Sequence, residues 1–206
     1  MPAKAVSRDR VLKEHEIALI WSAAVTMGHP FGSILQLLML TGQRCGEVAK
    51  MRWSEIDFGS GLWTIPGERT KNGEVHVVPL VKQTLQILTK LPHIDTAFVF
   101  PARHGDGGTY SGFGKAKYRL EALAAARIPA GHEPLTGWTL HDVRRTVATG
   151  LAGLGILPHI IERLLNHVTG TLGGVAGVYN RFKYLDEVRT ALELWTVHIE
   201  SIAAKK

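Results

Sequence analysis

A nearly uniform apolar segment, FGSILQLLMLTG, occupies residues 31–42. Pro30 precedes it and Gly42 follows its last apolar residues, which are typical boundaries of a helix. A helix that is apolar on every side has to be buried on every side, so the other elements must pack around it. Its apolar run is also far shorter than the ~20 residues that a membrane span needs. The segment therefore predicts a globular fold built around one central helix.

The remaining chain predicts more helices and one small sheet. Apolar residues recur with helical spacing in 11–27, 81–91, 113–128, 139–155, 158–167 and 186–202, and a short helix follows Arg44. Two β-rich segments flank Asn72-Gly73, a pair that tolerates positive φ and favours a hairpin. The stretch AFVFP, residues 97–101, predicts a short buried strand. No βαβ alternation occurs, so we expect a mostly α, α+β fold with a small antiparallel sheet.

Charge and cysteine content indicate which kind of partner and which compartment to expect. The chain has 206 residues, with 24 basic against 18 acidic side chains and a formal charge of +6, which is compatible with a polyanionic partner. Cys45 is the single cysteine, so no intramolecular disulfide can form and a reducing compartment is expected. The first residues contain no apolar signal region, and residues 1–10 have the composition of a tail or linker.

The stretch TLHDVRRT, residues 139–146, combines a helix start with basic side chains. Thr139 and Asp142 have capping-box spacing, so Thr139 is a candidate N-cap. His141 and Arg144 are three residues apart and share one face of that helix. Free N–H groups at a helix start, an imidazole and a guanidinium together suit a bound phosphate. Taken alone, however, this spacing is better explained by a solvated basic helix start.

Two further basic residues stand beside turns. Arg44 follows the break at the end of the apolar helix, and Glu47 lies one turn later, where its carboxylate can hold the guanidinium. Taken alone, this pair indicates a surface ion pair worth ~0.3 kcal/mol. Lys71 immediately precedes the predicted hairpin turn. A lysine there is usually just solvated, but it can also reach a substrate and donate a proton.

The last motif is LLNHVTGTLGGVAGVYNRF, residues 164–182. His167 ends a predicted helix, and Tyr179 follows twelve residues later across a glycine-rich stretch. Each also has a structural explanation: a histidine can satisfy helix-end carbonyls, and a tyrosine can be a half-buried core aromatic. Tyr184 is expected to pack at the start of the last helix.

In chain order, the candidate residues are Arg44, Lys71, His141, Arg144, His167 and Tyr179. In this order the chain resembles the catalytic domain of the tyrosine recombinases, in particular the phage-type integrases, over nearly its whole length. LTGQRCGEVAKMRW is similar to that family's first arginine motif, LHDVRRT to its HxxR motif, LLNH to its third motif and VYNR to its tyrosine motif. Four ordered motifs are specific where one is not.

The resemblance implies a reaction. The hydroxyl of Tyr179 attacks a DNA phosphodiester, leaving a 3′-phosphotyrosyl bond and a free 5′-hydroxyl, and the hydroxyl of a second strand reverses the attack without ATP. Arg44 and Arg144 would clamp the phosphate. These residue types fit independently, because phosphoryl transfer depends on electrostatic stabilisation and guanidinium forks can supply it in place of a metal. We find no metal-ligand pattern and expect neither metal nor cofactor.

Further roles follow from the same resemblance. His167 would add a donor to the phosphate, His141 would assist as base, and Lys71 would protonate the leaving 5′-oxygen. Glu47 would orient the arginine and the histidine. Basic residues expected to touch the DNA backbone are Arg69, Lys115, Lys117, Arg119, Arg145 and Arg181.

Some features depart from the family pattern. The interval from His167 to Tyr179 is longer than in many members, and Asn166 stands where many have glycine. Residues 1–10 look like an interdomain linker, so we expect a catalytic domain over 11–185 that was excised or is naturally short. The resemblance implies that a complete integrase also carries an amino-terminal DNA-binding domain that closes around the duplex. Without that domain, we expect weak DNA affinity that falls steeply with salt.

The resemblance also sets expectations for partners. They are a double-stranded DNA attachment site and, on DNA, a tetramer in which the last helix, 186–206, docks onto a neighbour. The isolated domain is expected to be a monomer or dimer without membrane association, in the bacterial cytoplasm and at the nucleoid when acting. Two alternatives stay open: a type IB topoisomerase-like enzyme, and a non-catalytic DNA-binding or regulatory module of the same fold.

Overall fold

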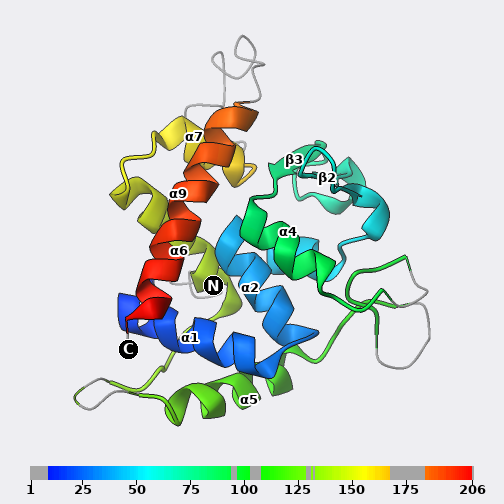
Figure 1. The fold of residues 1–206 in the computed structure, drawn as a ribbon. Coiled ribbons are helices and arrows are strands. Elements are labelled where there is room, and N and C mark those ends of the chain that lie inside the picture. Colours follow the sequence, from blue (N-terminus) through cyan, green and yellow to red (C-terminus); the bar gives the residue numbers. More distant parts are fainter. Residues whose placement is uncertain are drawn as a thin grey trace, which may run out of the picture.

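The computed structural model describes residues 9–93, 97–102, 108–128, 131, 133–167 and 184–205. Within them the chain is mostly helical, with a three-stranded antiparallel sheet to one side (Figure 1). The helices are α1 (Glu14–Met27), α2 (Phe31–Thr41), α3 (Cys45–Ala49), α4 (Lys82–Thr89), α5 (Phe113–Ala125), α6 (Leu140–Gly153), α7 (Pro158–Leu164) and α9 (Leu185–Ala204). None of these described helices is long and apolar enough to cross a membrane.

The apolar segment is the central helix, as its composition predicts. Nearly every residue of α2 is buried, and α1, α3, α4, α6 and α9 pack against it (Figure 1). Gly42 ends α2 in the left-handed region, with φ 65°, and its N–H donates to the Leu38 carbonyl at 2.9 Å. From α9, Trp195 donates its indole N–H to the Met39 carbonyl at 2.7 Å. This bond fixes the last helix against the central helix α2.

The predicted hairpin is present, but its connection is longer than expected. Strands β2 (Leu62–Ile65) and β3 (His76–Pro79) pair antiparallel, and β1 (Ile56–Asp57) adds a third strand. Residues 66–75 form the connection, which opens with a 3-10 helix at Gly67–Arg69 instead of a two-residue turn. Within this connection Gly67 packs directly against the backbone of Gly73, because a Cβ at Gly67 would lie 2.2 Å from the Gly73 carbonyl oxygen.

Residues 97–101 are buried at their centre, as predicted, but they do not form the predicted strand. Val99 and Phe100 are fully buried, but the segment makes isolated bridges, Phe98 to Arg52 and Pro101 to Thr109, and joins no sheet. The N–H of Val99 donates to the Met51 carbonyl at 2.9 Å. The segment is therefore tied to the chain after α3 instead of to β1–β3.

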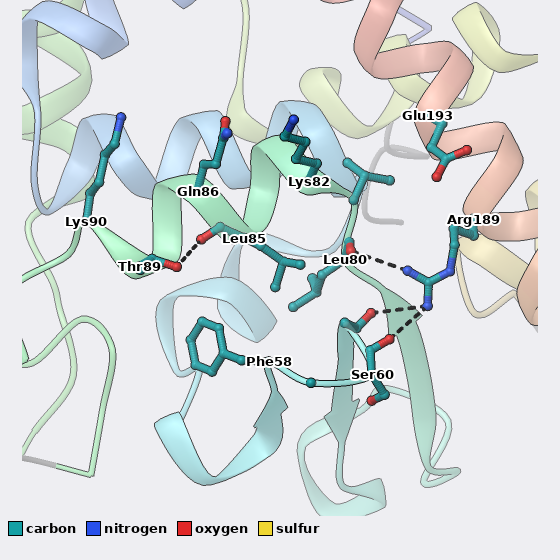
Figure 2. A pocket seen from close by; sticks show the side chains of 13 residues that line it. Phe58, Ser60, Leu80, Lys82, Leu85, Gln86, Thr89, Lys90, Arg189 and Glu193 are labelled. Atoms are coloured by element: carbon teal, nitrogen blue, oxygen red, sulfur yellow. Dashed lines mark hydrogen bonds between the residues drawn. The ribbon is translucent and has the colours of Figure 1, made fainter.

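The last helix packs on its own chain. α9 contacts α1, α2, α6, α7 and β3. Arg189 donates to the carbonyls of Ser60 at 3.2 Å, Gly61 at 3.4 Å and Leu80 at 3.4 Å, across the hollow that separates α9 from α4 (Figure 2). Tyr184 precedes α9 and its ring lies edge-on to His159 of α7, as expected for a packing residue. The structure therefore has α9 folded back on its own core.

Candidate functional site

The C-terminal end of α7 is where the predicted residues from distant parts of the chain meet. Three consecutive carbonyls, those of residues 164, 165 and 166, accept hydrogen bonds from side chains of other elements. The last carbonyls of a helix lack partners within the helix and carry partial negative charge. They therefore suit cationic donors, and two of the donors are Arg44 and Arg144.

Arg144 forms the buried floor of this site. It lies on α6, and its side chain crosses between two elements, donating Nη1 to the Gly42 carbonyl at 2.8 Å and Nη2 to the Leu165 carbonyl. The residue is 5% exposed. Burial lowers the pKa of Arg144 to about 10, and the neighbouring charge of Arg44 adds to the effect. The guanidinium still remains charged at neutral pH, fixed at the junction of α2, α6 and α7.

Arg44 lies closer to the surface and has an acidic partner. It precedes α3 in extended conformation, and its backbone N–H and Nη1 donate to the two oxygens of Glu47 at 2.9 and 2.8 Å. Its Nη2 reaches the Asn166 carbonyl at 3.5 Å. Glu47 is buried, so the carboxylate predicted to orient Arg44 does contact it from inside the core. Two guanidinium groups, one buried and one partly exposed, thus meet at the end of α7.

His76 is a member of this cluster that sequence reasoning missed. It lies on β3, 7% exposed, and its Nε2 is 3.1 Å from the Leu164 carbonyl. A carbonyl can only accept, so Nε2 carries the hydrogen. Burial lowers the pKa of His76 to about 4. Gln43 donates to the same carbonyl at 2.9 Å. The available signal was a histidine at an inward position of a predicted strand.

His141 occupies the first turn of α6, whose start is built as predicted. The backbone N–H and hydroxyl of Thr139 donate to the carboxylate of Asp142 at 2.7 and 2.8 Å. Burial lowers the pKa of His141, and the charges of Arg145 and Arg144 lower it further. The imidazole is therefore neutral at neutral pH and can accept a proton.

His167 follows α7 and belongs to the same electrostatic cluster. Its backbone N–H donates to the Glu162 carbonyl at 3.0 Å. Burial lowers the pKa of His167, followed by the charges of Arg144 and Arg44, and His141 contributes in the same direction. Both histidines thus lie beside the arginines, and both are held in the neutral form mainly by burial and further by that surrounding charge.

Lys71 lies on the loop 66–75 at the edge of the cluster. It is exposed and lines one surface hollow together with Arg44, Glu47 and Thr70. The structure thus brings the predicted lysine close to the first arginine. The two residues are far apart in sequence, and the loop between β2 and β3 makes the approach.

Other predicted contact residues have different environments. Arg69 is mostly buried: it pairs with Glu55 at 3.0 Å and donates to the carbonyls of Glu47 and Lys50. Its guanidinium therefore holds the loop to α3 and is not presented outward as expected for a DNA contact. Lys115 and Arg119 are exposed on α5.

Two more of the predicted DNA-contact residues pair with acidic side chains, and two predicted site residues lie in a part of the chain that the structure does not describe. Arg145 pairs with Asp142, and Lys117 pairs with Glu121 while its ammonium lies over the Trp138 ring at 4.6 Å. Tyr179 and Arg181 lie outside the described residues. Among the described residues, no group of three or more His, Cys, Asp or Glu side chains is arranged to hold a metal ion.

Comparison with known proteins identifies the family. The model of the phage integrase family matches residues 10–173, which is most of the chain. The chain belongs to the phage integrase family. Prophage integrases IntZ and IntA of Escherichia coli K12 are 35% and 32% identical to it, over 82% and 84% of this chain and 40% and 39% of their own. The chain thus spans about two fifths of the length of these relatives.

Solved structures show the same fold. A variant of the Tn1549 transposon integrase in complex with a circular intermediate DNA superimposes with a TM-score of 0.63 at 18% identity, covering 93% of this chain and 68% of that one. A lambda integrase dimer bound to a COC′ core site gives 0.57 at 23% identity, covering 84% and 63%. The helical arrangement with its small sheet is that of a tyrosine recombinase catalytic domain, as the sequence motifs predicted.

Proposed function

We propose that this chain is the catalytic domain of a site-specific DNA recombinase that cleaves and rejoins DNA through Tyr179. The observation that carries the proposal is the meeting of Arg44 and Arg144 at the end of α7, with His141 and His167 beside them. Two fixed guanidiniums and two neutral imidazoles form a site for a phosphodiester whose charge increases as phosphorus becomes five-coordinate. Relatives named as integrases support the same reaction class.

In the proposed cleavage step, the Tyr179 oxygen forms a bond to phosphorus and the bond from phosphorus to the 5′-oxygen breaks. The phenolic proton passes to His141, which is neutral and able to accept it. Lys71 gives a proton to the departing 5′-oxygen. Arg44, Arg144 and His167 donate hydrogen bonds to the non-bridging oxygens. Rejoining is the reverse, with a 5′-hydroxyl from a second strand, so no nucleotide cofactor is consumed.

The proposed partner is double-stranded DNA. Structures of similar fold are described as integrases in complex with DNA, and the net charge of +6 favours the same partner here. Exposed Lys115 and Arg119, together with Lys117, Arg145 and Arg181, are proposed to lie against the backbone; Arg69 is left out because its guanidinium is already paired. We propose a tetramer on DNA, in which α9 exchanges its packing with a neighbour, and weak, salt-sensitive binding by the 206-residue chain alone.

A nicked duplex carrying the ends of the element that encodes the chain tests this function. Attack at an intact phosphodiester close to the nick releases the short fragment between them, which carries the free 5′-hydroxyl. Rejoining then fails, so the covalent protein–DNA adduct accumulates and is counted on a denaturing gel. The adduct is expected with EDTA present, to be lost in Tyr179→Phe and to persist in Tyr184→Phe. An adduct that requires Mg²⁺ would defeat the proposed chemistry. DNA binding without any adduct would indicate a non-catalytic module, and relaxation of supercoils by a monomer would indicate a topoisomerase-like enzyme.

A further inference from the structure

A reciprocal amide pair joins the loop that carries Lys71 to the segment that carries His167. The Nδ2 of Asn72 donates to the Oδ1 of Asn166 at 2.8 Å, and the Nδ2 of Asn166 donates back to the Oδ1 of Asn72 at 3.2 Å. The two residues are 94 positions apart in the chain. Each one is the immediate neighbour of a residue with a proposed role in cleavage.

We propose that Asn72 and Asn166 are positioning residues that hold Lys71 in place to protonate the leaving 5′-oxygen. The inference rests on the proposed function and goes beyond it, because it assigns a role to two residues that touch neither the phosphate nor the nucleophile. A proton donor on a flexible side chain works only if its backbone is placed correctly, and a misplacement of about 1 Å can cost 10²-fold in rate.

The backbone at Asn166 explains why this chain can make the pair. Asn166 has φ 50°, in the left-handed region, which asparagine tolerates better than most residues with a side chain. A glycine would adopt the same backbone conformation more easily but has no amide to offer. Asparagine therefore satisfies the backbone and also reaches across to the loop, while its own carbonyl accepts from Arg44 at 3.5 Å.

The rest of the loop is held at its base. Arg69 anchors the start of the loop to Glu55 and to the end of α3. The hydroxyl of Thr70 lies 3.0 Å from the Gly67 carbonyl and 2.8 Å from that of Glu74, which closes the loop on itself. These contacts shape the loop without tying it to α7. The Asn72–Asn166 pair makes that connection, one residue from Lys71.

The pair thus positions Lys71, the proposed proton donor, relative to Arg44 and Arg144, the proposed phosphate clamp. Arg44 contacts the backbone of Asn166, and Lys71 shares the surface hollow with Arg44. When Tyr179 displaces the 5′-oxygen, the electron pair of the breaking bond stays on that oxygen and the Lys71 ammonium supplies the proton it takes up. If the pair is lost, the clamp remains complete but the proton donor is no longer held opposite the leaving atom.

A substrate with sulfur in place of the bridging 5′-oxygen separates positioning from mere folding. A thiolate leaves without needing a proton, so cleavage of this substrate does not depend on an acid. Asn72→Ala, Asn166→Gly and the double variant are expected to slow adduct formation on the oxygen substrate on the order of tenfold and to react like wild type on the sulfur substrate. Both single variants break the amide pair, and Asn72→Ala also removes the hydrogen bond from the Glu74 N–H to Asn72 Oδ1 at 3.3 Å, so the double variant should be no slower than Asn72→Ala alone.

Controls make each result decisive. Lys71→Ala should show the same rescue by sulfur, whereas Arg144→Met should form no adduct with either substrate. Asn166→Gly keeps the left-handed backbone, and melting curves for each variant show whether it folds. Equal slowing on both substrates, additive single effects or unchanged oxygen-substrate rates would overturn the positioning role. If Lys71→Ala is not rescued while wild type forms the adduct, the proposal fails and the recombinase function stands; if wild type forms no adduct with either substrate, both fail.

Discussion

The inner wall and the outer rim of the site are built in opposite ways. The inner wall, Gln43, Glu47, His76 and Arg144, is buried. Gln43, His76 and Arg144 make hydrogen bonds across the junction of α2, β3, α6 and α7, and Glu47 accepts from Arg44 at the start of α3. The outer rim, Lys71, His141 and His167, is exposed. The wall holds charge that must keep its geometry, and the rim presents groups that meet a substrate, so a substitution should affect stability in one region and activity in the other.

The largest effect is expected at the two arginines. Arg144 belongs to the inner wall, and Arg44 lies nearer the surface, toward the rim. Arg144→Met removes both donors from the Gly42 and Leu165 carbonyls, leaving buried acceptors unpaired, so unfolding free energy should fall by about 2–4 kcal/mol and the adduct should be lost. Arg44→Met should also abolish the adduct but destabilise less, by about 1–2 kcal/mol, because Arg44 is partly exposed and Glu47 keeps its hydrogen bond from the backbone N–H of residue 44. Denaturant unfolding with the nicked-duplex assay checks both. Equal destabilisation by the two would remove the distinction.

The next effect concerns acid. His76 is neutral in the folded protein with a pKa of about 4, against an ordinary value of 6.5. As pH falls, His76 is therefore protonated in the unfolded chain before it is protonated in the folded protein. The stability that His76 contributes is complete above pH ~6.5 and decreases by about 3 kcal/mol in all as pH falls toward 4. His76→Gln, which can still donate to the Leu164 carbonyl, should flatten that decrease.

The matched control for this acid dependence is His198→Gln, since His198 neighbours Glu14 instead of the cluster. Unfolding free energies measured from pH 7 to pH 4 should show the wild-type slope in the control. An unchanged slope in His76→Gln would mean that other groups carry the acid sensitivity of the wall.

A smaller effect is expected at Glu47, where wall and rim meet. Its two oxygens accept from the backbone N–H and Nη1 of Arg44, and Glu47→Gln leaves only one acceptor oxygen. Loss of a charged hydrogen bond worth about 1.5–3 kcal/mol should slow adduct formation roughly 10–100-fold. DNA affinity should change far less, because the charge of Arg44 remains. A rate equal to wild type would show that Arg44 needs no support from the wall.

The smallest effect should come from basic residues away from the cluster. Lys115→Ala and Arg119→Ala should leave stability unchanged, and each should reduce the salt slope of DNA binding by about one. Arg69→Ala should do the reverse, losing stability as the ion pair with Glu55 is removed while the salt slope stays. Binding titrations at several salt concentrations, with melting curves, distinguish the two patterns. A salt effect from Arg69 would place it on the rim.

Features encoded by neighbouring residues were predictable. The capping box of Thr139 and Asp142, the left-handed end of α2 at Gly42 and the helix start at Pro158 all depend on residues within a few positions of one another. The order of the family motifs was readable for the same reason, since each is a short local string. The prediction that Glu47 contacts Arg44 held because one helical turn separates them.

Features that depend on distant contacts were not predictable. Asn72-Gly73 predicted the hairpin but not the longer connection that residues 66–75 form between its strands, and the segment 97–101 makes single bridges instead of joining the sheet. Arg69 looked like a surface cation because its partner Glu55 precedes it on another element. In each case the deciding contact lies beyond the range of a sequence pattern.

By itself the sequence determined the central apolar helix, the helix boundaries, the family motifs and hence the chemistry proposed for Arg44, Arg144, His141, His167 and Tyr179. Only the tertiary structure decided which side chains share the end of α7. The donors to its three carbonyls come from residues about 20 to 120 positions away, and no local energy term records such a distance. Burial then determined which charges are fixed and which histidines stay neutral, because desolvation depends on what packs around a group, not on its neighbours in the chain.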